Sequence, residues 1–304
     1  MSKKINNRIN QYLKTNWLRP ETLLWDVHLS LLIEPYLKRK IKKLEVGIGN
    51  GINSFITLGG ELNKNYDTYQ NLNYNSFVTT EDIYNTYKKN SKKIIKKKVK
   101  NKFDLVIDRK ENLLKQARLL DISNTYLKHD CNKSIKIKDK FDLIYTNILY
   151  WLKNPFYNIR EFNDILDKNG LLIFTLPNEN FFKYCKSYKS KNKFWKKLNL
   201  KRNKHFNFSY KKKEISSKLK KIKFFKIIKV KSFLSKKSCK IWDIGTRIVS
   251  PELIKMSSSL SKNEKLIIKY NWCKKLHPLI YELIKDEIKD SKSGGFDLYI
   301  LKKV

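Results

Sequence analysis

Three glycines at alternate positions, Gly47, Gly49 and Gly51, follow a short apolar run that contains Glu45. Because glycine lacks a Cβ, a turn of this composition lets the backbone approach a bound ligand closely. The spacing differs from the Gly-x-Gly-x-x-Gly of dinucleotide sites, in which a pyrophosphate lies at a helix N-terminus. The carboxylate of Glu45 would also repel a phosphate and attract a cation. The motif therefore predicts a nucleotide cofactor that carries a positive charge.

Polar residues also stand at the ends of three apolar runs further along the chain. Asp108 closes one run, and Asp130 and Asn147 come directly after two others. In an open parallel sheet, ligands bind outside the carboxyl ends of the strands. We therefore expect a ligand at this edge of the sheet.

With these residues in this order, the sequence resembles the class I S-adenosylmethionine-dependent methyltransferases, in particular the small-molecule type often called type 11. The resemblance covers residues 44–178 well and the remainder loosely. It implies an α/β, Rossmann-like fold, with a mostly parallel seven-stranded sheet and helices on both faces. It also implies S-adenosyl-L-methionine as the cofactor and an enzyme of class EC 2.1.1.-.

The resemblance assigns parts of the cofactor to particular residues. In the family, the glycine loop accommodates the methionine part, an acid after the second strand binds the ribose hydroxyls, and an acid after the third binds the adenine amino group. Residues 44–51, Asp108 and Asp130 match these three elements. The predicted cofactor-binding residues are Glu45, Gly47, Gly49, Gly51, Asp108, Asp130 and Asn147.

The position of the ribose-binding acid departs from the family pattern. It usually lies about 20 residues past the glycine loop, whereas Asp108 lies much further along. Asp67 has the better distance, but the residues before it lack the apolar run of a central parallel strand. We therefore choose Asp108 and treat about 58–101 as an insertion, which contains a Tyr- and Asn-rich stretch and an Asp82-Ile83-Tyr84 element seen in one bacterial subgroup. A ligand-gripping role and a plain surface loop both remain open for it.

The acceptor side is less defined, because a sulfonium methyl is already a strong electrophile and a general base is optional. Asn147, Tyr150 and Trp151 follow the fourth strand and would face the methyl group, or would pack in the core. His129 is expected to form a wall of the site. His205 and Tyr150 are weak catalytic candidates, and a surface position for His205 is the simpler interpretation. Trp242 and Arg247 are further candidates for the acceptor pocket.

Alternating strand and helix patterns indicate crossover units on a parallel sheet. Residues 1–40 are predicted to be an N-terminal helical segment with a helix at 22–37, and 41–304 the methyltransferase domain, with a helical insertion at about 250–290 before the last strand. The predicted strands are 41–47, 103–108, 126–129, 141–146, 170–176, 224–230 and 294–301. The other predicted helices are 110–120, 156–166 and 214–219.

The net charge of +39 comes from 67 Lys and Arg against 28 Asp and Glu. Lys, Ile and Asn, all with A/T-rich codons, are abundant, so low genomic GC content explains the Lys surplus better than a dedicated nucleic-acid surface. Only 88–102 is clustered. The favoured acceptor is a small molecule, sugar or lipid-linked intermediate. The alternative is an RNA methyltransferase or RNA-binding protein that uses the Lys-rich surface, and a third class is a relative without a cofactor.

The four cysteines lie far apart in the sequence, and no pair has metal-ligand spacing. We expect neither a metal nor a disulfide. The longest uncharged run around the apolar maximum, 143–152, is much shorter than the ~20 residues that span a bilayer. The N-terminus lacks the unbroken apolar stretch of a secretory signal. A cytoplasmic protein without a membrane span is therefore expected, with no specific nucleic-acid partner.

Overall fold

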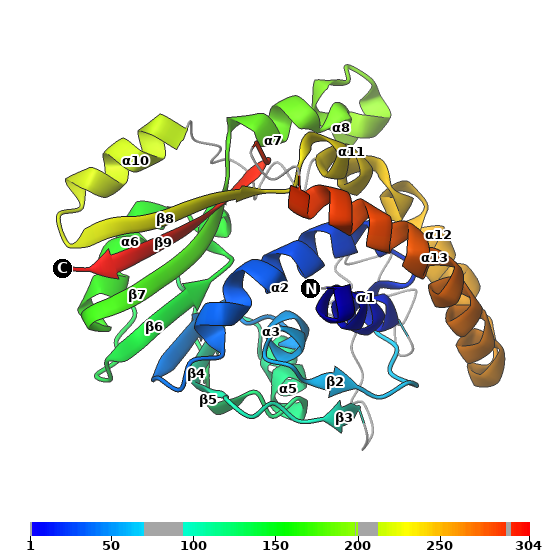
Figure 1. The fold of residues 1–304 in the computed structure, drawn as a ribbon, viewed down its shortest axis with the longest axis horizontal. Coiled ribbons are helices and arrows are strands. Elements are labelled where there is room, and N and C mark those ends of the chain that lie inside the picture. The colour runs from blue at the N-terminus through cyan, green and yellow to red at the C-terminus, as the bar shows by residue number, and fades with distance from the viewer. Residues whose placement is uncertain (1, 70–93, 198, 200–211, 290–292) are drawn as a thin grey trace.

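A seven-stranded sheet forms the centre of the molecule (Figure 1). The computed structural model describes residues 2–69, 94–197, 199, 212–289 and 293–304. The order across the sheet is β5-β4-β1-β6-β7-β9-β8. In chain order, these strands are β1 (Lys43–Val46), β4 (Phe103–Asp108), β5 (Ser123–Lys128), β6 (Phe141–Thr146), β7 (Leu166–Pro177), β8 (Phe225–Phe233) and β9 (Phe296–Lys303).

The strands from β5 to β7 run parallel, and β9 runs antiparallel to both of its neighbours. In the middle of the sheet, Leu44 of β1 pairs with Leu105 of β4 and Ile144 of β6, and all three side chains are buried. Central strands of this kind are covered on both faces, which explains their nearly continuous apolar sequence. The predicted seven-stranded, mostly parallel sheet is therefore confirmed.

The direction in which the chain crosses the sheet reverses between β1 and β6. It first moves from β1 to β4 and β5, and then returns to β6 and moves to β7 on the other side. Because parallel crossovers are right-handed, α3 (Ile52–Thr57) and α5 (Glu111–Leu119) cover one face and α6 (Pro155–Asp164) covers the other. Helices thus lie on both faces, as predicted, and a ligand-binding crevice is expected where the order reverses.

The N-terminal segment consists of α1 (Ser2–Asn16), a short 3₁₀ turn (Pro20–Thr22) and α2 (Leu23–Leu37). Helix α2 was predicted, and it is apolar on nearly all sides because α1 and α13 (Lys262–Lys289) both pack against it (Figure 1). Helix α1 lies in the predicted helical segment 1–40 but was not predicted as a separate helix, although its buried residues Ile5, Ile9, Tyr12 and Leu13 recur at helical spacing.

The long helical region before the last strand is two helices rather than one. Helix α12 (Ser250–Ser258) ends before α13 begins.

Within the insertion at about 58–101, β2 (Glu61–Leu62) and β3 (Ile95–Lys97) form an antiparallel pair outside the main sheet. Residues 70–93, with the Asp82-Ile83-Tyr84 element, lie outside the described residues. The remaining elements are η3 (Leu149–Trp151), α7 (Glu179–Tyr184), α8 (Lys186–Lys189), α10 (Lys212–Lys221), α11 (Lys236–Ile244) and η4 (Thr246–Ile248).

The four cysteines are free thiols, and Cys131, Cys185 and Cys239 are buried. Among the helices that the structure describes, none has both the length and the apolar character to cross a membrane.

A buried pair joins α2 to the C-terminal helix α13. His28 Nδ1 lies 3.0 Å from Glu287 Oε1, and both side chains are almost completely inaccessible. The backbone N–H of Ser235 donates to both oxygens of Glu287, at 3.0 and 2.9 Å. Burial alone would raise the pKa of Glu287, but hydrogen bonds from His28, Ser238 and Ser235 lower it to about 2. This carboxylate therefore fastens α13 and the start of α11 to the N-terminal helices.

We predict that Glu287→Ala destabilises the protein by ~3 to 5 kcal/mol, since it leaves buried partners without their acceptor. Urea unfolding near pH 7 measures the change. The neighbouring Asp286 is half-exposed and pairs with the exposed Lys237, so Asp286→Ala is the control and should cost under ~1 kcal/mol. Equal effects of the two substitutions would contradict a fastening role for Glu287.

Candidate functional site

A cavity of about 280 Å³ opens at the carboxyl ends of the central strands. It lies where the sheet order reverses between β1 and β6, the place at which open α/β sheets bind ligands. Its lining comes from the segments after β1, β4, β5 and β6: Gly47, Ile48, Gly49, Asn50, Asn53, Asp108, Arg109, Lys110, Leu113, His129, Asp130, Cys131, Asn132, Asn147, Ile148, Tyr150, Trp151 and Leu152.

The glycine turn after β1 requires glycine for two different reasons. Gly47 and Gly49 have φ values of +81° and +59°, in the left-handed region that disfavours other residues. A Cβ on Gly47 would lie 2.5 Å from the side chain of Ile148. A Cβ on Gly49 would meet nothing within 4 Å, and Gly49 lines the cavity. Gly47 thus permits close packing, whereas Gly49 leaves the cavity open beside the backbone.

Asp108 ties the glycine turn to the end of β4. Its Oδ2 accepts a hydrogen bond from Gly49 N–H at 2.9 Å, and its Oδ1 accepts one from Lys110 N–H at 2.9 Å. An ionised carboxylate has about four acceptor sites, so both oxygens keep capacity for a ligand in the cavity. Asp67, the alternative, lies elsewhere, where it accepts from Trp17 Nε1 at 2.9 Å and pairs with the buried Lys269.

Asp130 lies after β5 and also lines the cavity. Asn132 donates to its Oδ1 through both the backbone and the side-chain amide, each at 3.0 Å. These hydrogen bonds, helped by the charges of Arg109 and Lys133, lower the pKa of Asp130 against the effect of its partial burial. His129 lines the same wall, as predicted, with Nε2 3.3 Å from Lys133 O. Asp130 is therefore a charged acceptor at neutral pH.

The segment after β6 forms the third side of the cavity. The Thr175 hydroxyl of β7 donates to Asn147 Oδ1, which fixes the Asn147 side chain. Tyr150 is buried, and its ring packs edge to face against Trp151 and Phe296 at 5.9 and 5.7 Å. All three residues that were predicted to follow the fourth strand, Asn147, Tyr150 and Trp151, line the cavity.

Two predicted cofactor-binding residues do not line the cavity. Gly51, with φ +78°, is the N-cap of α3 and packs against Ile122 and Ala117. Glu45 lies within β1 and is buried, with Oε2 lacking a hydrogen-bond partner among the described residues. Burial raises the pKa of Glu45 to about 8, with the charge of Asp108 adding to the increase and a hydrogen bond from Ser54 opposing it. Their roles in cofactor binding stay predictions.

A second cavity, of about 220 Å³, adjoins the first. Three residues line both cavities and therefore lie at the boundary between them: Asn50, Asn53 and Tyr150. The N-terminal helices, which the sequence did not predict to reach the site, supply much of the second lining. Its residues are Thr15, Asn16, Arg19, Thr22, Trp25, Asp26, Asn50, Ile52, Asn53, Thr68, Tyr69, Tyr150, Trp242 and Phe296.

Of the acceptor candidates further along the chain, Trp242 lines the second cavity, and so does Tyr69 from the insertion. Arg247 does not line it: its guanidinium donates to Asn199 Oδ1 at 2.9 Å and pairs with Asp243 at 3.6 Å. His205 lies outside the described residues.

Sequence reasoning overlooked Asp26, which lines the second cavity. A signal for it exists in the sequence, because it is an acid in a helix whose other positions are almost all apolar or buried.

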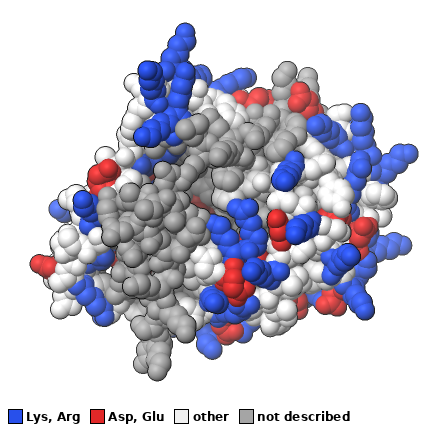
Figure 2. Space-filling view, turned by 180° about the vertical axis from the view of Figure 1, so that it is seen from behind, with Lys and Arg blue, Asp and Glu red and all other residues white. Residues whose placement is uncertain are grey.

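Four of the five described lysines of the basic cluster 88–102 have acidic partners, the exception in the ion pairs being the exposed Lys100. Lys96 and Lys97 pair with Glu61 at 3.2 and 3.8 Å, and Lys98 and Lys102 pair with Asp121. Figure 2 shows Lys and Arg spread over the described part of one face, with Asp and Glu among them. This distribution fits a Lys surplus that is not gathered for nucleic acid, and we do not propose RNA as the acceptor.

No family model and no curated protein matches the chain. Among solved structures, it is similar to the plantazolicin methyltransferase BpumL in complex with a substrate analogue and SAH (TM-score 0.48, 11% identity, 95% of this chain and 87% of that chain). A possible histamine N-methyltransferase from Thermotoga maritima has TM-score 0.45, 15% identity and full coverage of both chains. A Geobacter sulfurreducens methyltransferase with S-adenosyl-L-homocysteine has TM-score 0.45, 10% identity and 92% and 90% coverage.

The chain has the Rossmann-like fold of class I methyltransferases. The sheet order and the antiparallel β9 support this assignment. At the identities above, the neighbours carry no information about the acceptor of this chain.

We predict that Glu45→Gln stabilises the protein at pH 8 and has little effect near pH 5. Between the ordinary pKa of 4.5 and the value of about 8, folded Glu45 holds a proton that the unfolded chain has released. This group therefore makes stability fall as pH rises through that window. Glutamine keeps the shape and removes the titration. Thermal unfolding of both proteins from pH 5 to 8.5 measures the difference.

Glu282→Gln is the control, because Glu282 is exposed on α13, where it pairs with Lys285. It should leave the pH dependence of unfolding as in the wild type. The explanation fails if Glu45→Gln shifts the melting temperature equally at pH 5 and pH 8.

Proposed function

We propose that this chain is an S-adenosyl-L-methionine-dependent methyltransferase that acts on a small-molecule or glycan acceptor. The observation that carries the proposal is the cavity at the sheet reversal, where Gly49, Asp108, Asp130 and Asn147 meet from four separate strand ends. These are residues that the resemblance assigned to the cofactor. The adjoining second cavity supplies a place for the acceptor.

The residues present fit this cofactor. The open space beside Gly49 suits a ligand that lies against the backbone. Asp108, held by two backbone N–H groups, would accept hydrogen bonds from the ribose hydroxyls. Asp130, held by Asn132, would accept from the adenine amino group. When bound, the cofactor supplies an electrophilic methyl group on a sulfonium.

The task left for the protein is to place the acceptor and exclude water. Tyr150, Asn50 and Asn53 lie between the two cavities, so an acceptor in the second cavity approaches the first along these side chains. Tyr150 is held by its ring contacts with Trp151 and Phe296. This wall therefore orients the acceptor.

We predict that the wild type binds S-adenosyl-L-homocysteine and that Asp108→Asn weakens binding by ~1.5 to 3 kcal/mol, the range for a hydrogen bond to a charged group. Gly49→Arg should abolish binding, since the side chain would fill the open space beside the turn. Isothermal titration calorimetry measures all three proteins. The absence of heat from the wild type at millimolar ligand would refute the proposed function.

Asp104→Asn is a matched control for Asp108→Asn. Asp104 lies in the same strand, and its Oδ2 accepts a backbone hydrogen bond from Lys43 N–H at 2.7 Å, but it does not line the cavity. Its substitution should leave affinity for S-adenosyl-L-homocysteine within about twofold, which is ~0.4 kcal/mol. If Asp104→Asn lowered this affinity as much as Asp108→Asn does, the two β4 carboxylates would affect binding only by stabilising the fold.

A further inference from the structure

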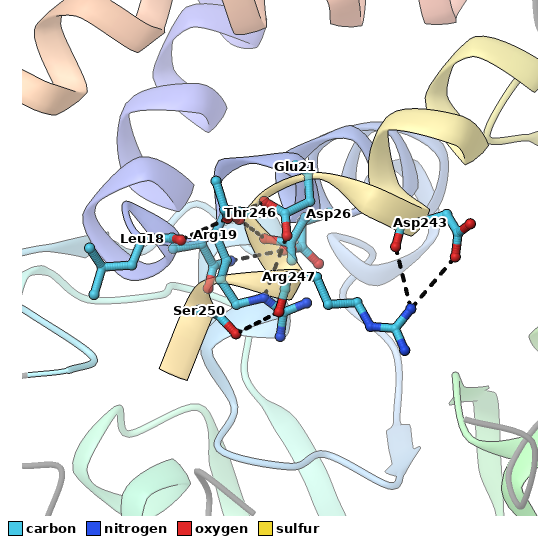
Figure 3. Close-up of polar contacts among 10 residues, drawn as sticks. Leu18, Arg19, Glu21, Asp26, Asp243, Thr246, Arg247 and Ser250 are labelled. Atoms are coloured by element: carbon cyan, nitrogen blue, oxygen red, sulfur yellow. Dashed lines mark hydrogen bonds and ion pairs between the residues drawn. The ribbon is translucent and has the colours of Figure 1, made fainter. Parts of the chain in front are cut away.

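The second cavity contains an unusual balance of charge. Arg19 and Asp26 are its two charged lining residues among those described. Arg19 Nε lies 3.6 Å from Oε1 of Glu21, whose side chain is only 2% exposed. Figure 3 shows Arg19, Glu21 and Asp26 gathered where the chain passes from α1 to α2. One guanidinium is thus shared by two carboxylates, and an ionised Asp26 leaves the cluster with one excess negative charge.

Glu21 is fixed in this cluster from the other side. Thr246 Oγ1 lies 2.8 Å from Glu21 Oε2 and 2.8 Å from Leu18 O. A Cβ on Gly245 would lie within 2.6 Å of the Glu21 side chain, so the chain passes directly against it. The buried Glu21 needs the charge of Arg19 nearby, because an unpaired buried carboxylate is costly. Arg19 is therefore committed to Glu21 and offers Asp26 only part of its charge.

Asp26 lines the cavity, and among the described residues its hydrogen bonds come from side-chain amides. Asn16 Nδ2 donates to its Oδ2 at 3.1 Å, and Asn53 provides a second hydrogen bond. Asn53 also lines the cavity at the sheet reversal. Asp26 is therefore one side chain away from the proposed cofactor site.

The other walls are aromatic. Trp25 and Trp242 lie 6.4 Å apart between ring centroids, and Trp25 packs edge to face against Phe296 at 4.1 Å. Tyr69 and Tyr150 complete this part of the lining. Aromatic faces attract cations, and they do so more strongly where water is excluded.

The charged residues that line this cavity differ from what the Lys-rich composition of the chain would predict. With a net charge of +39, a cavity lined at random would contain lysine. Among the described residues that line this one, none is lysine, and its one cation, Arg19, is paired with Glu21 beside the cavity. A Lys surplus from codon usage does not explain this balance. A cavity with aromatic walls, beside a cluster of charges that has one excess negative charge, is complementary to a small cation.

We propose that the second cavity is the acceptor site and that the acceptor is a small primary or secondary amine, bound with its nitrogen beside Asp26. This inference rests on the proposed methyltransferase function and names its substrate class. The amine enters as an ammonium ion, and its charge is balanced by the Asp26 carboxylate.

Methyl transfer requires the ammonium ion to lose a proton first. The ammonium N–H bond breaks, and its proton passes to an Asp26 oxygen. The freed nitrogen lone pair forms the N–CH₃ bond while the S–CH₃ bond of the methyl donor breaks, and that bonding pair stays on sulfur. The products are a methylated ammonium ion, S-adenosyl-L-homocysteine and a protonated Asp26, which then releases its proton to solvent. Burial raises the pKa of Asp26 to about 7, against the hydrogen bond from Asn53 and the charge of Arg19, so the carboxylate is a better base than an exposed one.

A charge series on one carbon skeleton tests the binding. The full-length protein, loaded with S-adenosyl-L-homocysteine, is titrated with benzylamine, benzyl alcohol and benzoate in a ligand-observed NMR experiment. We expect benzylamine to bind at least tenfold more tightly than the other two. Equal or tighter binding of the alcohol or the benzoate, or no binding of benzylamine at 20 mM, overturns the proposal.

Asp26→Asn tests the assigned residue, because asparagine can still accept from Asn16 but carries no charge. It should remove most of the preference for benzylamine over benzyl alcohol and leave affinity for S-adenosyl-L-homocysteine unchanged. Asp26→Glu should restore part of the preference. Asp139→Asn, at an exposed site next to Lys42, is the control and should behave as wild type. A preference that survives in Asp26→Asn overturns the role of Asp26.

The two proposals fail in different ways. Without binding of S-adenosyl-L-homocysteine, the methyltransferase function itself is refuted. If S-adenosyl-L-homocysteine binds, and a screen with labelled S-adenosyl-L-methionine shows methyl transfer to alcohols or carboxylates but not to amines, the function stands and the amine inference is refuted. Methyl transfer to an amine by the wild type, reduced at least 30-fold in kcat/KM by Asp26→Asn, supports both.

Discussion

The site depends on one hydrogen bond between two strand ends, from Gly49 N–H to the Asp108 carboxylate. It fixes the turn after β1 against the end of β4, on the side of the sheet reversal where a ligand fits. Gly49 adopts a left-handed φ while its N–H donates to Asp108, and as a glycine it places no side chain in the cavity. The same carboxylate accepts Lys110 N–H at the start of α5. One acid thus organises the turn, the strand end and the next helix.

Sequence patterns predicted the parts of the structure that depend on neighbouring residues. All seven strands of the main sheet and helices α2, α5, α6 and α10 were predicted, because apolar periodicity over a few residues reflects the burial of one face. Asp108 was preferred to Asp67 for the same reason, since only the residues before Asp108 have the composition of a central strand, and the structure places it at the cavity. The split between α12 and α13 was not predicted.

The acceptor side could not be predicted because its residues are brought together by long-range packing. Asn16, Asp26, Tyr69 and Trp242 come from four parts of the chain, and no local pattern indicates that they face one space. Within the predicted helical segment 1–40, α1 was not recognised as a separate helix although its periodicity was present, and it supplies Thr15 and Asn16 to the second cavity. The glycine motif also could not predict that Glu45 is buried, because a motif specifies residue types and not which carboxylate faces the ligand.

The acidic residues of this basic chain differ in their hydrogen-bond and ion-pair partners, and these partners determine what each carboxylate can do. Glu287 and Glu21 are buried with fixed partners, and Asp130 is held charged by the amides of Asn132. Asp26 differs, because its direct partners are amides and the nearest cation, Arg19, is already paired. With 67 basic residues in the chain, neutralising Asp26 would need only one lysine on the cavity wall. With Arg19 paired to Glu21 and aromatic rings on much of the wall, the proposed amine would balance the Asp26 carboxylate, so we expect this cavity to select its acceptor by charge more than by shape.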